Sequence, residues 1–188
     1  MAEKVAAGSF LFAVPQMLDP NFMHSVVLLV EHGPAGAYGL VTNRPLDATV
    51  DQLLPDRERL HGHPFPLHSG GPVGEDTLQF LHTVPDAIPG GVEIVEGLWM
   101  GGEVEGLEQA IAEGVASPSC LRLFVGYSGW GEGQLDGELE IGSWVVAPPA
   151  PGLVFDERGQ EALWRRALRS LGRDGDGLSR LPPDVSWN

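Results

Sequence analysis

The sequence predicts an α+β domain built around a mixed, largely antiparallel sheet. Segments with strand-like composition mostly follow one another, and about three helical segments are interspersed irregularly among them. Short turns rich in glycine and proline join the first strands, which favours antiparallel pairing. The chain does not show the regular alternation of strands and helices that a doubly wound parallel sheet would require.

The first half of the chain is predicted to consist mainly of strands. The run from Val26 to Val30 is continuously apolar, so this strand is expected at the centre of the sheet with both faces buried. A short helix around TVDQLL is expected to end before Pro55. The stretch HGHPFPLHSGGPVGED, residues 61–76, is rich in proline and glycine, which predicts a loop. Strands are expected at Ser9–Pro15, Ser25–Glu31, Tyr38–Asn43, 77–84 and 91–97.

The second half adds the two longest expected helices. Between residues 103 and 115 apolar side chains recur at spacings of three and four, which predicts an amphipathic helix. A final helix is expected over about Glu157–Leu171, with Asp156 as its N-cap and Gly172 as its C-cap. Buried strands are expected at Leu121–Val125, continuing to Trp130, and at Gly142–Pro148.

The length of 188 residues predicts one domain, which we place at residues 1–172. Residues 173–188 are rich in glycine, aspartate and proline and are expected to form a partly ordered tail. No apolar run approaches the roughly 20 residues that cross a bilayer, and the N-terminus does not resemble a signal peptide, so no membrane association is expected. The single cysteine, Cys120, cannot form an internal disulfide, which favours a cytoplasmic location.

Charge restricts the possible partners. Eleven basic residues stand against 26 acidic ones, so the net charge is −15 and the pI is near 4.6. A nucleic-acid backbone would be repelled by such a field unless the basic residues gathered on one face. Arg165, Arg166, Arg169 and Arg173 lie near one another in the final helix, but Glu157 and Glu161 share that segment. Direct nucleic-acid binding is therefore not expected.

The residues that could carry chemistry match no known catalytic or metal-binding spacing. His61, His63, His68 and His82 lack the spacing of a zinc site such as HExxH, so neither a metal nor another cofactor is expected. The glycines after Val125 do not follow a phosphate-binding pattern. Ser128 matches G-x-S-x-G only loosely, because Trp130 stands where the second glycine belongs.

Two polar pairs each leave two interpretations open. If the chain is helical from Gln134, then Gln134 and Glu138 lie on one face, where they could bind a polar ligand or hydrogen-bond the neighbouring loop. Asn43 and Arg44 stand at the end of a strand and could form a turn. Arg44 could also pair with a buried carboxylate or with an anionic ligand.

Three long motifs resemble the YqgE/AlgH family of bacterial proteins. They extend over Gly8–Pro45, Ser69–His82 and Gly126–Pro148, and the closing FDERGQEALWRRALRSLG and VSWN are also similar to that family. Some members carry a cysteine shortly before GGPV, which this chain lacks. The matching motif positions are Asp19, Pro20, Asn21, Phe22, Glu31, His32, Gly39, Asn43, Arg44, Pro45, Gly70, Gly71, Pro72, Gly129, Trp130, Gly133, Gln134 and Glu138.

The resemblance implies an α+β fold with a mixed, barrel-like sheet in a cytoplasmic protein. Members are often labelled regulators of transcription on genetic grounds, and the resemblance implies no agreed catalytic residues, so none is assigned. We therefore expect a binding or regulatory protein that acts on a protein or a small molecule and affects transcription only indirectly. The alternative is a hydrolase that uses carboxylates near Trp130.

The motifs LDPNF, TNRP, SGGPV and GWGEGQ each fall at a strand end or a turn, where binding residues gather. They are either unrelated turns or parts of one groove at one end of the sheet. In the groove hypothesis Phe22 and Trp130 form the walls, and Asn43, Arg44, Gln134 and Glu138 are the polar contacts. The complete set of candidate residues for this groove is Asp19, Phe22, Asn43, Arg44, Gly70, Gly71, Trp130, Gln134 and Glu138.

Overall fold

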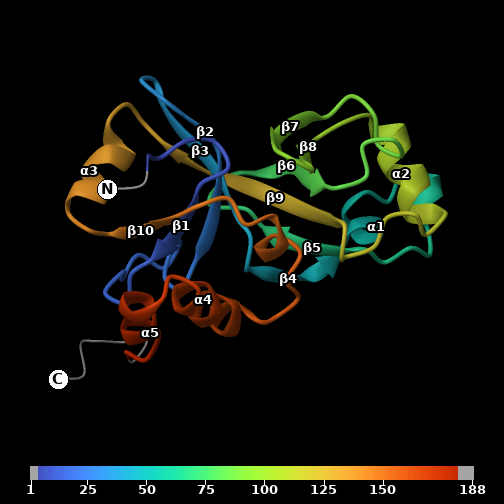
Figure 1. Cartoon of the computed structure of the whole chain (residues 1–188). Coiled ribbons are helices and arrows are strands. Elements are labelled where there is room, and N and C mark those ends of the chain that lie inside the picture. The colour runs from blue at the N-terminus through green and yellow to red at the C-terminus, as the bar shows by residue number, and fades with distance from the viewer. Residues whose placement is uncertain (1–3, 182–188) are drawn as a thin grey trace.

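The computed structural model describes residues 4–181, which form a ten-stranded sheet with helices packed against it (Figure 1). The strands are β1 (Phe10–Ala13), β2 (Val26–Gly33), β3 (Gly36–Val41), β4 (Pro45–Thr49), β5 (Pro66–Ser69), β6 (Val73–His82), β7 (Val92–Val95), β8 (Leu98–Met100), β9 (Leu121–Trp130) and β10 (Trp144–Ala147). The α-helices are α1 (Val50–Leu53), α2 (Val104–Ala112), α3 (Gln134–Glu140), α4 (Gln160–Arg169) and α5 (Arg173–Ser179), and the 3-10 helices are η1 (Glu58–Leu60) and η2 (Pro151–Leu153).

The strand order confirms the α+β class and the mixed, largely antiparallel sheet. The paired strands run in the order β10-β1-β2-β3-β9-β6-β8-β7, and β5 joins β9 with β4 on its outer side. The β5–β9 pair is parallel, and the other pairs are antiparallel. The sheet does not close into a barrel, and five α-helices stand in residues 4–181 where about three were expected.

Strand β9 connects the two parts of the sheet and runs across the middle of the molecule (Figure 1). Leu123–Val125 pair with β5, residues between Leu121 and Tyr127 pair with β6, and Ser128–Trp130 pair with β3. The pairing with β5 ends just before Gly126, whose φ is +72°. A Cβ at Gly126 would overlap the carbonyl oxygen of Gly71, so this crossing requires glycine.

The strands at the N-terminal end of the chain are covered on both faces. On one face Phe10, Phe12 and Leu28 pack against Trp164 of α4, and on the other Leu11 and the rest of a second cluster pack beside α3. Residues Val26–Val30 are almost completely buried, with at most 7% of any of them exposed. The expectation of a central strand buried on both faces is therefore confirmed.

The other part of the sheet has its own core. Leu107 and Ile111 of α2 pack against Leu121 and Leu123 of β9, together with Phe80 of β6. The amphipathic pattern predicted over 103–115 is thus confirmed as α2, although the helix itself ends at Ala112. The strand predicted from Leu121 is confirmed as β9.

Three strands were not predicted, and the predicted loop over 61–76 is wrong in part. That stretch contains β5 and the start of β6, and β4 and β8 were also missed. The prolines did not prevent β5 from forming, because Pro66 is its first residue and therefore stands where a proline is tolerated.

The ends of the final helix also differ from the prediction. Helix α4 begins at Gln160 with Gly159 as its N-cap and ends at Arg169 with Ser170 as its C-cap, so neither Asp156 nor Gly172 caps it. Residues 173–179, which were expected to belong to a partly ordered tail, form α5. Residues 182–188, including the closing VSWN, lie outside the described residues. In the part described, no helix is both long enough and apolar enough to cross a membrane.

Candidate functional site

Three aromatic rings meet beside α3, one from the loop before β2, one from the end of β9 and one from β10. The ring of Phe22 stacks on Trp130 with a centroid separation of 5.7 Å and meets Trp144 edge-on at 5.4 Å. Trp130 and Trp144 are each only 4% exposed. Phe22 and Trp130 therefore converge as the groove hypothesis requires, but they pack against each other and do not face each other across an opening.

Glu138 of α3 holds this aromatic cluster together. Its Oε2 accepts hydrogen bonds from Nε1 of Trp130 at 3.0 Å and from Nε1 of Trp144 at 2.7 Å. Its Oε1 accepts one from Nε2 of Gln134 at 3.1 Å, and Oε1 of Gln134 accepts one from the backbone N–H of Gly131. Of the two interpretations left open for Gln134 and Glu138, these contacts match hydrogen bonding within the neighbouring structure.

Arg44 lies on the other side of the loop that carries Phe22. Its guanidinium donates to the carbonyl oxygen of Asn21 at 2.7 Å and to that of Pro20 at 3.4 Å. Burial lowers the pKa of Arg44, and the charge of Asp19 acts in the opposite direction. Asp19 itself is exposed, and its carboxylate accepts the backbone N–H of Asn21. Arg44 and Trp130 are thus held close to the same short loop.

The remaining candidates have structural contacts. Asn43 is buried, and its side chain bonds Val26, His24 and Gln160 through their backbone groups at 2.8–2.9 Å. A Cβ at Gly70 or Gly71 would overlap the backbone of β9, so these glycines allow the close approach of two segments. The β9 residues that they approach are Gly126–Ser128.

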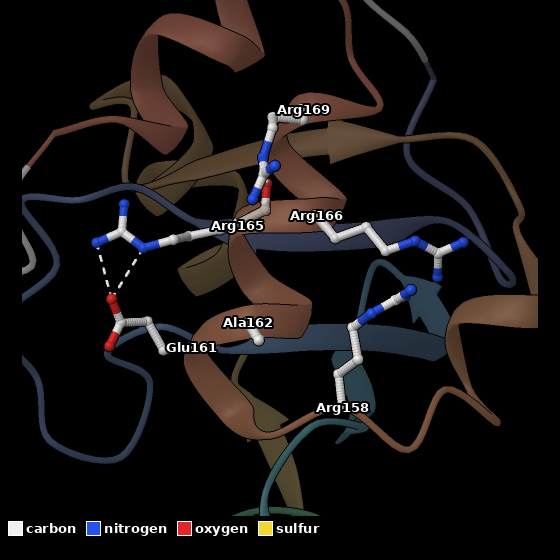
Figure 2. A pocket seen from close by; sticks show the side chains of 6 residues that line it. All are labelled: Arg158, Glu161, Ala162, Arg165, Arg166 and Arg169. Carbon is white, nitrogen blue, oxygen red and sulfur yellow. Dashed lines mark hydrogen bonds and ion pairs between the residues drawn. The ribbon is translucent and has the colours of Figure 1, made fainter.

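A surface hollow connects the Arg44 loop to α4. This hollow of ≈ 470 Å³ is lined by Pro20, Met23, His24, Arg44, Gln160 and Glu161. Glu161 also borders a larger hollow of ≈ 670 Å³ on the outer face of α4, which is lined by Arg158, Glu161, Ala162, Arg165, Arg166 and Arg169 (Figure 2). We call the second surface the arginine face.

The arginines of this face differ in how firmly they are held. Arg165 pairs with Glu161 at 2.8 Å and also donates to the carbonyl oxygen of Ser179 in α5. Arg158 and Arg166 both pair with Asp156, whose side chain is 8% exposed, and each keeps about half of its own side chain exposed. Arg169 is exposed and makes no ion pair within residues 4–181. Arg158, Arg166 and Arg169 are therefore the arginines available to an external anion.

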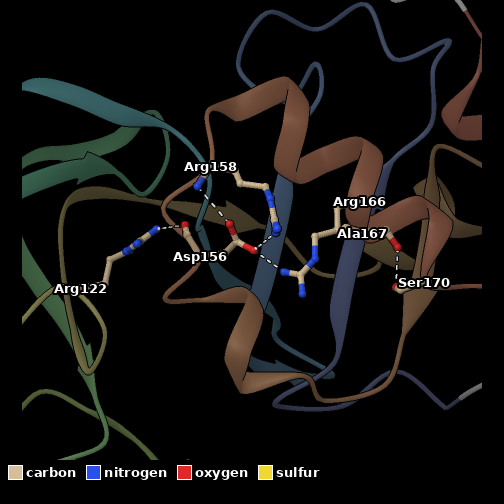
Figure 3. A network of polar contacts seen from close by, with 6 residues as sticks. All are labelled: Arg122, Asp156, Arg158, Arg166, Ala167 and Ser170. Carbon is tan, nitrogen blue, oxygen red and sulfur yellow. Dashed lines mark hydrogen bonds and ion pairs between the residues drawn. The ribbon is translucent and has the colours of Figure 1, made fainter.

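Asp156 also connects the arginine face to the interior (Figure 3). Its carbonyl oxygen accepts a hydrogen bond from Nη1 of Arg122 at 3.1 Å, while its carboxylate binds Arg158 and Arg166. Arg122 is 3% exposed although it carries a charge. Sequence reasoning missed this residue, and the available signal was an arginine inside the apolar run LRLFV of a buried strand.

The histidines do not form a metal site in the described residues. Within 4–181 there is no group of three or more histidine, cysteine, aspartate and glutamate side chains placed to hold an ion. Nε2 of His82 donates a hydrogen bond to the carbonyl oxygen of Gly101 at 2.9 Å. His68 lies beside Arg122 in the interior, and sequence reasoning had considered it only as a metal ligand.

Known proteins of one family match this chain over nearly its whole length. A family model described as AlgH-like matches residues 10–176. A UPF0301 protein of Chlorobium phaeobacteroides is 38% identical over 180 residues, which are 96% of this chain and 94% of that protein. A UPF0301 protein of Chlorobaculum tepidum is 40% identical over 90% of this chain and 89% of its own length.

Two solved structures share the fold. The crystal structure of a protein from Corynebacterium diphtheriae superposes with a TM-score of 0.76 at 26% identity, covering 96% of this chain and 95% of that one. The solution structure of the AlgH protein from Pseudomonas aeruginosa gives a TM-score of 0.71 at 31% identity and covers 97% of both chains. The extent of these matches shows that the chain belongs to the AlgH-like family of bacterial proteins.

Proposed function

We propose that the protein acts by binding, without a catalytic step of its own, and that it contacts an acidic segment of a partner protein through the arginine face. The observation that carries this proposal is the distribution of charge. Residues 156–180 hold six basic and five acidic residues, so their net charge is +1, and the rest of the chain carries −16. The arginine face is the part of the surface where an anion meets the least repulsion.

The chemistry of this face fits carboxylates. A guanidinium group presents a planar fork that binds both oxygens of a carboxylate, and Arg158, Arg166 and Arg169 are exposed enough to do so. A long nucleic acid would extend beyond α4 onto the acidic remainder of the surface, whereas a short acidic segment would stay on the arginine face. Any effect on transcription is therefore proposed to pass through a protein partner.

The candidate residues from the sequence motifs lie next to the arginine face on one side. The aromatic cluster fixes Phe22, and Arg44 binds the carbonyl oxygens of Pro20 and Asn21. Arg44 lines the hollow of ≈ 470 Å³, and Glu161 lines both that hollow and the arginine face. In this proposal Asp19, Phe22 and Arg44 shape the rim of the binding surface, and Gln134 and Glu138 hold the cluster behind it.

The hydrolase alternative has weaker support in the geometry. A carboxylate that acts as a base or nucleophile needs a free lone pair directed at the substrate. Three of the four lone pairs of the Glu138 carboxylate already accept hydrogen bonds, from Gln134, Trp130 and Trp144. A hydrolase screen of the wild-type protein and the folded Glu138→Gln variant decides the matter, because activity that disappears in the variant would favour the alternative.

The binding proposal is tested with a fluorescent peptide rich in aspartate and glutamate, followed by anisotropy at low salt. Arg169→Glu is expected to weaken binding about three- to thirtyfold, because each exposed ion pair contributes roughly 0.2–1 kcal/mol and a reversal also adds repulsion. The control is Arg59→Glu, which makes the same change of charge at an exposed residue of η1. Equal effects of the two variants, or tighter binding of duplex DNA than of the peptide, would refute the proposal.

A further inference from the structure

A second anion site is indicated inside the molecule, around Arg122 of β9. This guanidinium is 3% exposed, and no carboxylate of residues 4–181 lies within ion-pair distance of it. Burial lowers the pKa of Arg122, while Glu157 and Asp156 raise it from a greater distance. A buried charge without a partner is costly, so an anion that pairs with Arg122 would be stabilised.

The hydrogen bonds of Arg122 leave one edge of the guanidinium free. Nη1 donates to the carbonyl oxygens of Thr42 and Asp156, both at 3.1 Å. Nε and Nη2 make no hydrogen bond with any group in the described part of the chain. These two nitrogens form a flat pair of donors that matches the two oxygens of a carboxylate.

A pocket of ≈ 170 Å³ adjoins this guanidinium. Its polar lining consists of Arg122, His68 and Glu157, and its apolar wall consists of Phe65, Leu121 and three prolines. His68 is 8% exposed, and its Nδ1 is buried without a hydrogen-bond partner among residues 4–181. The pocket therefore combines a buried cation, an imidazole ring that makes no side-chain hydrogen bond within residues 4–181, and an apolar wall.

His68 is suited to bind an anion as a neutral donor. Burial, and after it the charge of Arg122, lowers the pKa of His68 to about 3, so the ring is uncharged near neutral pH. A neutral imidazole carries one N–H donor, which it can direct at an oxygen of the ligand. The positive charge at the site then comes from Arg122 alone and Glu157 adds a negative charge, so a ligand with one negative charge fits better than one with two.

We propose that this pocket binds a small monocarboxylate, with its oxygens held by Arg122 and His68 and its short apolar group against Phe65 and Leu121. Pockets for drug-sized ligands measure roughly 300–1,000 Å³, so this one fits a smaller group. The carboxylate can belong to a free short-chain acid or to the last residue of a peptide chain. This proposal does not depend on the arginine face, whose partner and test are different.

The test is an NMR titration that follows the Nε–H signal of Arg122. Isovalerate is compared with isovaleramide, and a tetrapeptide ending in leucine with a free carboxylate is compared with its C-terminal amide. The carboxylates are expected to shift this signal at concentrations up to about 10 mM, and the neutral amides are not. The tighter of the two carboxylate ligands identifies the source. No shift with either carboxylate, or equal shifts with the amides, would overturn the proposal.

Two variants make the test specific. His68→Phe keeps an aromatic ring but removes the imidazole, and it is expected to weaken binding about two- to tenfold, the effect of one hydrogen bond. Glu157 is exposed at the pocket, so Glu157→Gln should fold normally and remove repulsion, which strengthens binding about two- to fivefold. If Glu157→Gln instead destabilises the protein and leaves affinity unchanged, Glu157 serves as the counter-ion of Arg122 and the proposal fails.

Discussion

Glu138 receives hydrogen bonds from two indole groups through a single oxygen. A carboxylate is well suited to this role because it offers several lone pairs and no hydrogen that would repel a donor. An amide at the same position can present only one acceptor atom. The identity of residue 138 therefore matters for the packing of Trp130, Trp144 and Phe22, whatever partner the protein binds.

Glu138→Gln is expected to lower the free energy of unfolding by about 1–3 kcal/mol, because both indoles then bond a neutral oxygen and the new amide nitrogen meets Nε2 of Gln134, which is also a donor. Urea unfolding followed by tryptophan fluorescence measures this change. Glu140→Gln is the matched control, since Glu140 belongs to the same helix and is exposed. It should change the free energy of unfolding by less than about 0.5 kcal/mol. Similar changes in the free energy of unfolding for the two variants would show that the hydrogen bonds to Glu138 contribute little to stability.

The pKa of His68 makes stability dependent on pH in a predictable direction. The folded state holds this pKa at about 3, below the ordinary value of 6.5. The unfolded chain therefore takes up a proton as the pH falls below about 6.5 while the folded protein does not, and the contribution of His68 to stability is lost on acidification. Between pH 7 and pH 5 this loss should be about 2 kcal/mol. Urea unfolding at pH 7 and pH 5 measures the loss of unfolding free energy on acidification. This loss should be smaller in His68→Phe than in the wild-type protein by about 2 kcal/mol. An equal loss in the two proteins would contradict the buried, neutral state of His68.

The candidate residues show which contacts can be predicted from sequence. The contact between Phe22 and Trp130 matches the groove hypothesis, which was one of the two alternatives that the motifs left open. Trp144 was missed as their partner, since GSWVVAP predicts a strand and nothing in it indicates where the indole lies. Arg122 and His68 line the same pocket, which could not be predicted either. Their proximity depends on the parallel pairing of β5 with β9.

At the level of elements, the sequence predicted those that bury a regular apolar pattern. Strands β1, β2, β3 and β9 and helix α2 belong to this class. The short strands β4, β5 and β8 were missed because their formation depends on neighbouring strands rather than on composition. The N-terminal end of α4 was misplaced for a similar reason, since Asp156 looks like a cap in sequence but binds Arg158 and Arg166 in space.

Helix α5 offers a test of how closely it packs on α4. A Cβ at Gly175 would overlap the backbone carbonyl of Leu168, whereas no atom lies within 4 Å of a Cβ at Gly177. Gly175→Ala is expected to lower the free energy of unfolding by about 1–3 kcal/mol. Gly177→Ala should raise it by about 0.5–1 kcal/mol, because alanine favours the helix. Thermal unfolding of both variants measures the difference, and equal midpoints would mean that α5 does not pack on α4 as described.

At the scale of the whole molecule, the uneven charge distribution has a consequence for salt dependence. Binding of an acidic peptide to the arginine face should weaken as ionic strength rises, because exposed charges are screened over about 10 Å at 0.1 M salt. Binding of a monocarboxylate beside Arg122 should depend less on salt, since that guanidinium is buried. Isothermal titration calorimetry over a range of salt concentrations gives, for each ligand, the slope of log affinity against log salt concentration. Equal slopes would show that both ligands bind the same exposed surface.

Asp156 gives these two proposed sites a physical connection. Its backbone oxygen binds Arg122 and its carboxylate binds Arg158 and Arg166 (Figure 3). Asp156 is therefore a residue that contacts both proposed sites.

The partner is proposed to contact the arginine face, and an NMR titration of the isotopically labelled protein with the acidic peptide maps that contact. The largest shifts are expected on the backbone amides of α4 and on the Nε–H signals of Arg158, Arg166 and Arg169. Shifts confined to α3 and the indole signals of Trp130 and Trp144, or spread evenly over the surface, would contradict it.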